Sequence, residues 1–175
     1  MSGQLPLQGL RVLDLASFIA GPVASTVMGD YGAEVIKIEP PGEGDPQRKL
    51  GQAHSIPQHP VNFCWHMTNR NKRSVVLDLK NPLGREAFDR LVATADVMVV
   101  NFPLKVRERL RMRYADVKPA NPRLIYASMT GYGAQGPDAE QPGFDSTAFF
   151  ARSGLLDALT YEGGPPAFSL PAQGD

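Results

Sequence analysis

Short runs rich in valine, isoleucine and leucine recur along the chain, and segments with a helical spacing of apolar positions separate them. Runs of this length and composition, several of them followed closely by proline, are typical of buried strands. Strands are therefore predicted at residues 11–15, 34–39, 74–79, 96–101 and 123–128. Strands that alternate with helices predict an α/β fold, in which helices cover both faces of a parallel, Rossmann-like sheet.

The predicted helices carry start and stop signals. Proline near the first turn and Gly32 after the last turn favour a helix over residues 23–31. Asn81 is a good N-cap and Pro82 a good first residue for a helix that runs to about Ala95. Its apolar stripe contains Ala87, Phe88, Leu91 and Val92. Further helical turns are expected within residues 61–68, 104–121 and 145–153.

Ligands of a parallel sheet bind beyond the carboxyl ends of its strands. The 17 glycines and 16 prolines crowd into residues 40–60, 131–143 and 163–174, which predicts long loops of the kind that build sites. Residues 42–60 in particular are expected to be loop. No Gly-x-Gly-x-x-Gly follows the first predicted strand and no Walker lysine motif occurs, so a nicotinamide dehydrogenase is disfavoured.

Charge is balanced over the whole chain but not along it. Residues 69–118 hold twelve basic and six acidic residues, whereas the formal net charge of the chain is zero. The basic segment suits a polyanion, which can be a phosphate-bearing cofactor or a nucleic acid, and a solvated surface is the alternative. The zero net charge and the lack of a known binding motif argue against nucleic acid.

Composition excludes several other classes. The 175 residues are 42% hydrophobic and 21% charged, which is ordinary for a globular domain. No apolar run could span a membrane and the first residues lack a secretory signal, so a cytoplasmic protein without membrane contact is expected. Cys64 is the single cysteine, which excludes an internal disulfide and a multi-thiolate site. His54, His59 and His66 lack metal-ligand spacing, so no metal is expected.

Seven segments in a fixed order carry a family resemblance. They are Gly9–Leu15, Ala20–Pro22, Asp30–Pro40, Asn69–Ser74 with Leu77–Lys80, Ala95–Phe102, Asn121–Tyr126, and Gly131–Gly133 with Gly136–Pro137. Each is weak alone, but together they resemble the amino-terminal part of the family III CoA-transferases, of the formyl-CoA transferase and carnitine CoA-transferase type. The resemblance extends over about residues 7–175.

The resemblance implies that residues 1–175 are the amino-terminal part of a CoA-binding large domain. The rest of that domain and a small domain would be absent from this chain, and full-length subunits would form an interlocked homodimer. The implied enzyme moves CoA from an acyl-CoA thioester to a carboxylic acid, so coenzyme A or acyl-CoA is its substrate and no metal takes part. This part alone is expected to be inactive.

The family's nucleophile is an aspartate that often stands in a Gly-Asp pair, shortly after a stretch like Pro165–Phe168. The matching residue here is Asp175. The resemblance implies that its carboxylate forms a mixed anhydride with the acyl group and then an aspartyl-CoA thioester, which divides the exchange into several acyl transfers.

The family's CoA contacts also correspond to residues of this chain. They are Leu77, Lys80, Asn101, Phe102 and Arg109. Because Arg107, Arg111 and Arg113 cannot all share a helical face with Arg109, some of them are expected to be spectators. Two departures concern the substrate: formyl-CoA transferases commonly have arginine where this chain has Pro40, and glutamine where it has Ile19. The second departure suggests a less polar acyl pocket than one for formate or oxalate.

Two alternatives remain within this fold. The related α-methylacyl-CoA racemases use a histidine in a Gly-His-Asp motif, whereas the matching segment here is Gly143-Phe144-Asp145, and phenylalanine cannot transfer a proton. The other alternative is a non-catalytic partner subunit that only binds CoA, against which an intact Asp175 argues. A nucleic-acid-binding module is the least favoured of the alternative functions.

Overall fold

The computed structural model describes residues 3–54, 56–166 and 172–174. The chain separates into two compact units, residues 1–129 and residues 130–175. Among the described residues, no helix is long and apolar enough to cross a membrane.

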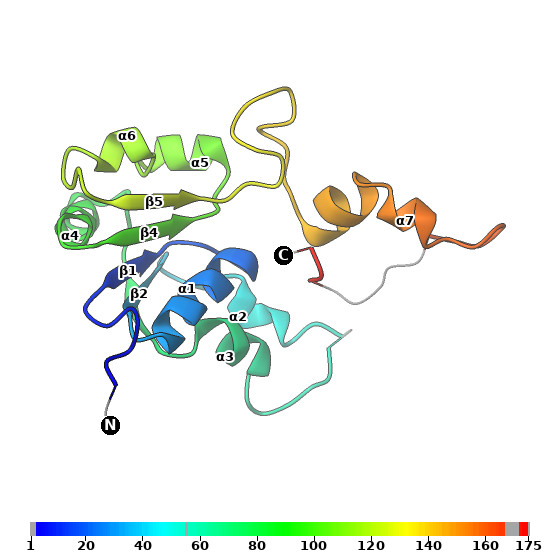
Figure 1. Ribbon diagram of the computed structural model, residues 1–175, viewed down its shortest axis with the longest axis horizontal. Helices are drawn as coiled ribbons and strands as arrows, with labels where there is room; N and C mark the ends of the chain where they lie inside the picture. Colours follow the sequence, from blue (N-terminus) through cyan, green and yellow to red (C-terminus); the bar gives the residue numbers. More distant parts are fainter. Residues whose placement is uncertain (1–2, 55, 167–171, 175) are drawn as a thin grey trace. The chain divides into compact units, whose positions relative to one another are not determined.

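The first unit is built on a five-stranded parallel sheet (Figure 1). Its strands are β1 (Arg11–Asp14), β2 (Glu34–Glu39), β3 (Lys72–Val76), β4 (Val97–Val100) and β5 (Ile125–Ser128). The spatial order is β3-β2-β1-β4-β5, and every neighbouring pair is parallel. The predicted fold class is confirmed. The order reverses direction between β1 and β4, which is where open parallel sheets bind their ligands.

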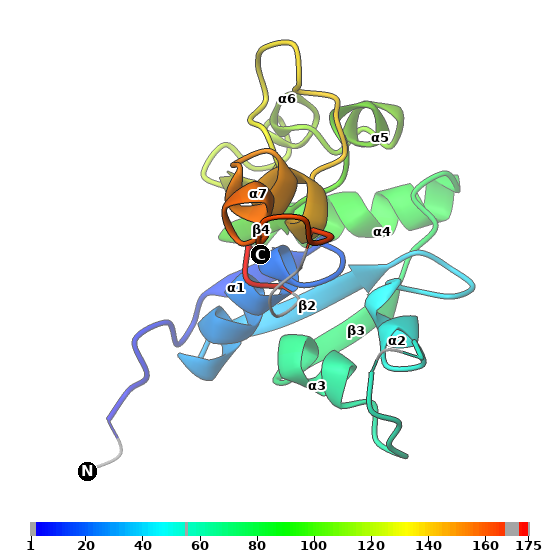
Figure 2. The same ribbon diagram turned by 90° about the vertical axis from the view of Figure 1, so that its right-hand side faces the viewer.

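Helices cover both faces of this sheet (Figures 1 and 2). They are α1 (Ala20–Asp30), α2 (Gln47–Leu50), α3 (Phe63–Asn69), α4 (Pro82–Ala93), α5 (Leu104–Arg109) and α6 (Tyr114–Val117). The α4 helix begins as predicted, since the Asn81 side chain accepts a hydrogen bond from Leu83 N and Pro82 is its first residue. The α1 helix begins before the predicted residue 23, because a helix leaves its first N–H groups unbonded and Pro22 therefore fits its first turn.

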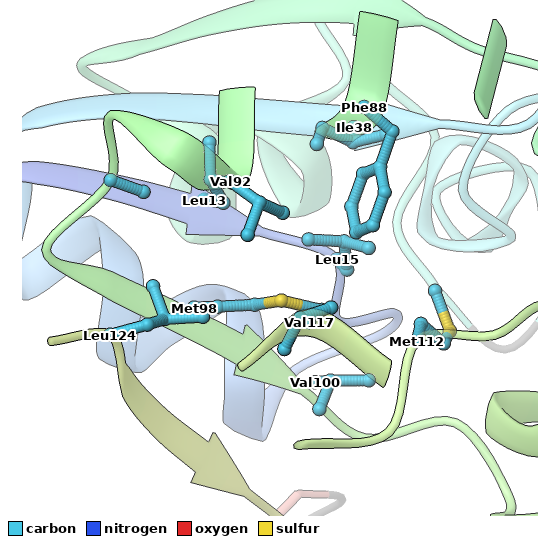
Figure 3. Packing of buried hydrophobic residues seen from close by; sticks show 11 residues of the cluster. Leu13, Leu15, Ile38, Phe88, Val92, Met98, Val100, Met112, Val117 and Leu124 are labelled. Atoms are coloured by element: carbon cyan, nitrogen blue, oxygen red, sulfur yellow. The ribbon is translucent and has the colours of Figure 1, made fainter. Parts of the chain in front are cut away.

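Side chains that alternate along the strands enter two apolar layers. On one face, Phe88 and Val92 of α4 pack on Leu13, Ile38 and Met98 (Figure 3). On the other face, Met28 of α1 packs against a cluster that contains Val12, Ala33, Val35 and Val99. Neighbours such as Leu13 and Val12 face opposite layers because strand side chains alternate. Both layers hold the sheet rigidly, so the loops at its carboxyl ends start from fixed points.

Two further expectations differ from the structure. The third strand ends at Val76 rather than at Leu79, because Asp78 accepts hydrogen bonds from Lys80 N and Asn81 N and turns the chain out of the sheet. The predicted loop over residues 42–60 contains the short helix α2, which begins where the Asp45 side chain accepts a hydrogen bond from Gln47 N.

The second unit contains a π-helix, η1 (Asp145–Ala151), and one turn of α-helix, α7 (Leu155–Ala158). The helix predicted within residues 145–153 is therefore present, but it is wound more widely than an α-helix. Phe150 is buried and its ring meets that of Phe149 edge to face at 5.2 Å. Short π-helices are rare and occur frequently at functional sites.

Candidate functional site

A cavity of about 250 Å³ opens at the carboxyl ends of the strands in the first unit. Its walls come from four strand ends: Leu15 follows β1, Pro40 follows β2, residues 77–80 follow β3 and Phe102 follows β4. A floor of apolar side chains with polar groups at the rim is typical of a cofactor site. The cavity lies where the parallel topology places a ligand.

A second, more open cavity of about 840 Å³ shares Leu79, Lys80 and Leu110 with the first. Its walls come from α4, from the end of α5 and from the turn after β3, and basic side chains dominate it. They are Lys80, Arg85, Arg90, Arg109 and Arg111. Only Glu86 and Asp89 oppose them among the lining residues. Together the cavities form an elongated site with one apolar and one cationic compartment.

The cationic side chains of this site differ in whether they are paired with other groups of the protein. The guanidinium of Arg85 binds Asp89 and the carbonyls of Leu110 and Arg111, so it holds α4 against the end of α5. The side chains of Lys80 and Arg109 are exposed and have no hydrogen-bond or ion-pair partner among the residues that the structure describes. Unpaired cations that face a cavity are suited to an anionic ligand.

The structure brings together four of the five predicted CoA contacts. Leu77, Lys80 and Phe102 line the smaller cavity, and Lys80 and Arg109 line the larger one. Asn101 lines neither cavity. Its carboxamide accepts a hydrogen bond from Ser17 N and donates one to Ser17 O, both at 2.8 Å. It therefore joins the loop after β4 to the loop after β1, at the point where the strand order reverses.

Arg107 does not line either cavity, but it holds the backbone of Phe102, which lines the smaller one. Its side chain is buried in α5 and donates to the carbonyls of Phe102 and Met129 and to Ser128 Oγ. In the sequence, Arg107 is one of several clustered basic residues of which some are expected to be spectators. One signal could have placed it: Leu104 and Leu110 lie three residues to either side, so Arg107 shares the inward face of a short helix.

A network of buried charges lies under the loop after β1. Asp14 of β1 and Lys37 of β2 are register partners in the sheet, and Lys37 Nζ lies 3.7 Å from Asp14 Oδ1. Lys37 Nζ also lies 2.6 Å from Asp45 Oδ2. Lys72 Nζ lies 2.7 Å from Asp14 Oδ2. Asp45 also accepts a hydrogen bond from Phe18 N, and Phe18 has the positive φ of 64° that is strained for a non-glycine residue. The network therefore fixes the loop beside the cavity.

The ionisation of this region follows from its burial. Burial alone would raise the pKa of Glu39, but hydrogen bonds from Arg48, Ser74 and the Asp45 N–H outweigh it and lower that pKa to about 2. Burial lowers the pKa of Lys72 to about 8, although Asp14 acts in the opposite direction. One weak signal for the buried charges is visible along the chain, namely Lys37, which interrupts the apolar run of β2.

The remaining candidates lie elsewhere. The predicted nucleophile Asp175 and part of the Pro165–Phe168 stretch lie outside the described residues. Phe144 precedes η1, and Asp145 is the first residue of that helix. Cys64 is buried and His66 is exposed. Within the described ranges, no group of His, Cys, Asp and Glu side chains could hold a metal ion.

The chain is similar in sequence to known CoA-transferases. Over 168 residues the chain is 40% identical to cinnamoyl-CoA:phenyllactate CoA-transferase of Clostridium sporogenes, covering 95% of this chain and 40% of that protein. Over 170 residues it is 38% identical to (R)-2-hydroxy-4-methylpentanoate CoA-transferase of Clostridioides difficile, covering 97% and 42%. The chain thus spans about two fifths of the length of these relatives.

Solved structures also match this chain, both in fold and in sequence. A CAIB/BAIF family protein from Brucella suis matches with a TM-score of 0.83 and 36% identity, over 95% of this chain and 44% of that one. The D175A mutant of Rv3272 from Mycobacterium tuberculosis matches with a TM-score of 0.81 and 37% identity, over 93% and 43%. The family model described as CoA-transferase family III matches residues 7–175. The chain therefore belongs to CoA-transferase family III.

Proposed function

We propose that this chain is the amino-terminal, CoA-binding part of a longer subunit that moves CoA from an acyl-CoA thioester to a carboxylic acid. One observation carries the CoA site: the exposed cations of Lys80 and Arg109 face an open cavity that joins the apolar cavity of Leu77 and Phe102. Coenzyme A combines phosphate groups with an adenine ring, and the two compartments match these two kinds of surface.

Lys80 and Arg109 would bind the phosphate groups, and Leu77 and Phe102 would contact the adenine ring. A guanidinium or ammonium group bound to phosphate makes a charge-assisted hydrogen bond. Arg107 and Asn101 would act indirectly, since the first holds the carbonyl of Phe102 and the second holds the backbone of Ser17. The apolar ring of Phe102 is thereby kept at the cavity wall without a ligand present.

Asp175 would be the nucleophile. Its carboxylate attacks the thioester carbonyl and expels CoA thiolate, which leaves a mixed anhydride. The thiolate attacks the aspartyl carbonyl, releases the donor acid and leaves an aspartyl-CoA thioester. The acceptor carboxylate attacks that thioester and expels the thiolate again. The thiolate then attacks the acceptor's acyl carbon, which gives the new acyl-CoA and restores the aspartate.

The acceptor would be a carboxylic acid with an apolar or modestly polar side chain. The named relatives are transferases of phenyllactate and of 2-hydroxy-4-methylpentanoate, and Ile19 stands where formyl-CoA transferases commonly have glutamine. We further propose that full-length subunits form an interlocked homodimer, as the family resemblance implies. Light scattering of the full-length protein that gives a monomer mass would contradict this.

Calorimetric titration of the full-length protein with CoA tests the site. Arg109→Ala and Lys80→Ala are each expected to raise the Kd by a factor that corresponds to roughly 1–3 kcal/mol, the value of a hydrogen bond to a charged group. Arg123→Ala is the matched control, because this exposed arginine precedes β5 at the opposite edge of the sheet. Unchanged CoA binding in both cavity variants would exclude the site.

The nucleophile has a separate test. Incubation with acyl-CoA and then with hydroxylamine should convert Asp175 to its hydroxamate, which peptide mass spectrometry detects. Asp175→Asn should lose transferase activity by several orders of magnitude, because an amide cannot form the anhydride. Substantial residual activity, or modification of another residue, would overturn this assignment.

A further inference from the structure

The carboxylate of Asp145 binds the backbone of the segment that ends the described chain. Its Oδ2 accepts a hydrogen bond from Ala172 N at 2.8 Å, and its Oδ1 accepts one from Gly174 N at 2.6 Å. Residues 172–174 therefore lie beside the start of η1 (Figures 1 and 2). One side chain holds two N–H groups that stand two residues apart, directly before Asp175.

A second contact from the same helix fixes this segment. A Cβ atom at Gly174 would lie 2.2 Å from Cβ of Phe149, so only glycine can occupy this position at the observed distance. Phe149 follows Asp145 by four residues, so both contacts come from one turn of η1. Ala172 has a positive φ of 67°, a conformation that is strained for alanine. The N–H of Ala172 is the one bound by Asp145 Oδ2.

The start of η1 is itself anchored. A Cβ at Gly131 would lie 2.5 Å from Cα of Gly143, so the two backbones touch just before the helix begins. The chain therefore enters η1 from a fixed point, and Asp145 is its first residue. A carboxylate on a fixed backbone with both oxygens bound has little freedom to reorient.

We propose that Asp145 is a positioning residue for the nucleophile, because it holds on η1 the residues 172–174 that directly precede Asp175 in the chain. This inference rests on the proposed role of Asp175. It gives a function to the Gly143-Phe144-Asp145 segment, which lacks the histidine that proton transfer would need. It also explains why the residue before the nucleophile is a glycine.

Asp145→Asn in the full-length protein tests the proposal. Asparagine keeps the shape but replaces one acceptor oxygen with an NH₂ donor, which would face a backbone N–H donor. Asp157→Asn is the control, because Asp157 is exposed on α7 and its carboxylate has no bonding partner among the residues that the structure describes. Gly174→Ala is a second variant that disturbs the segment from the Phe149 side.

Two readouts separate the positioning role from a merely structural one. Hydrogen exchange of the peptide that contains residues 172–174 should become about tenfold faster in Asp145→Asn, because one of its hydrogen bonds is lost. The rate of hydroxamate formation at Asp175 and kcat should both fall about tenfold to hundredfold, as expected when a reacting group is misplaced by about 1 Å. The Kd for CoA should stay within about twofold, since Asp145 is not one of the residues proposed to contact CoA.

The outcomes are distinct. Unchanged exchange in Asp145→Asn, or faster exchange with unchanged kcat, overturns the positioning role. A fall in kcat that Asp157→Asn shows equally also overturns it. If the wild-type protein forms no adduct at Asp175, the proposed nucleophile is wrong, and Asp145 then positions nothing in the reaction even where the exchange result stands.

Discussion

Lys37 Nζ lies 2.6 Å from Asp45 Oδ2, and both side chains are almost completely buried. The lysine stands in the middle of β2 and the aspartate in the loop after it, so the pair connects the sheet to the loop that borders the cavity. Asp14 completes the arrangement on β1. Removal of the Lys37 charge would leave the buried carboxylate of Asp45 without this cation, whereas Asp14 would keep Lys72.

Lys37→Met is therefore expected to destabilise the full-length protein by about 3–5 kcal/mol, the usual cost of breaking a buried ion pair from one side. Urea denaturation followed by circular dichroism measures this loss. Lys49→Met is the matched control, since Lys49 and Glu43 form an exposed ion pair whose loss should cost less than about 1 kcal/mol. Equal losses of stability in the two variants would show that the buried network stabilises the protein no more than an exposed ion pair does.

Glu39 should make the stability of the protein sensitive to acid. Its pKa in the folded protein is about 2, against an ordinary value of 4.5, so the unfolded chain binds more protons between these pH values. The free energy of unfolding should therefore rise with pH across this window and decline as pH falls from 4.5 towards 2, by up to about 3 kcal/mol.

Glu39→Gln should flatten this pH dependence, which denaturant midpoints measured at pH 3 and pH 6 would reveal. Glu43→Gln is the control, because the Glu43 side chain is three-quarters exposed and pairs with Lys49 at the surface. A steep acid transition that survives in Glu39→Gln would assign it to other carboxylates.

Gly84 lies inside α4, where alanine normally stabilises a helix by up to about 1 kcal/mol. Here a Cβ would lie 2.2 Å from the carbonyl oxygen of Asp78, so Gly84→Ala must displace the turn that carries Lys80. We expect lower stability and weaker CoA binding, measured by thermal unfolding and calorimetry. Gly29→Ala in α1 should have a small effect, since its nearest contact would be a side-chain carbon at 3.3 Å.

Arg107→Lys tests whether the buried guanidinium shapes the cavity. A lysine cannot bind three acceptors with the fixed geometry of the guanidinium fork, so Phe102 should lose its anchor. We expect the free energy of unfolding to fall by roughly 1–3 kcal/mol, because acceptors are left unbonded, and we expect a higher Kd for CoA. Arg123→Lys at the exposed surface serves as the comparison, and identical CoA affinities in the two variants would exclude this role of Arg107.

Much of the fold can be predicted from the sequence because its signals are local. The apolar runs of β1, β2 and β4 and the cap and proline of α4 depend on neighbours along the chain, and all four elements lie where the pattern predicts them. The parallel topology follows from the alternation of strands and helices. It also explains why Leu77 and Lys80, which follow β3, line one cavity with Phe102, which follows β4.

Only the tertiary structure decided the roles of the buried polar side chains. Asn101 lies at a strand end like a ligand contact, yet its carboxamide holds Ser17, which is 84 residues away in sequence. Arg107 looks like one of several surface arginines, and Asp145 looks like the remnant of a proton-transfer motif. Apart from Ser128 Oγ, which Arg107 also binds, their partners are backbone groups, which every residue has, so no residue type in the sequence marks them. A hydrogen bond between distant segments becomes visible only when the packed layers have brought both ends to the same place.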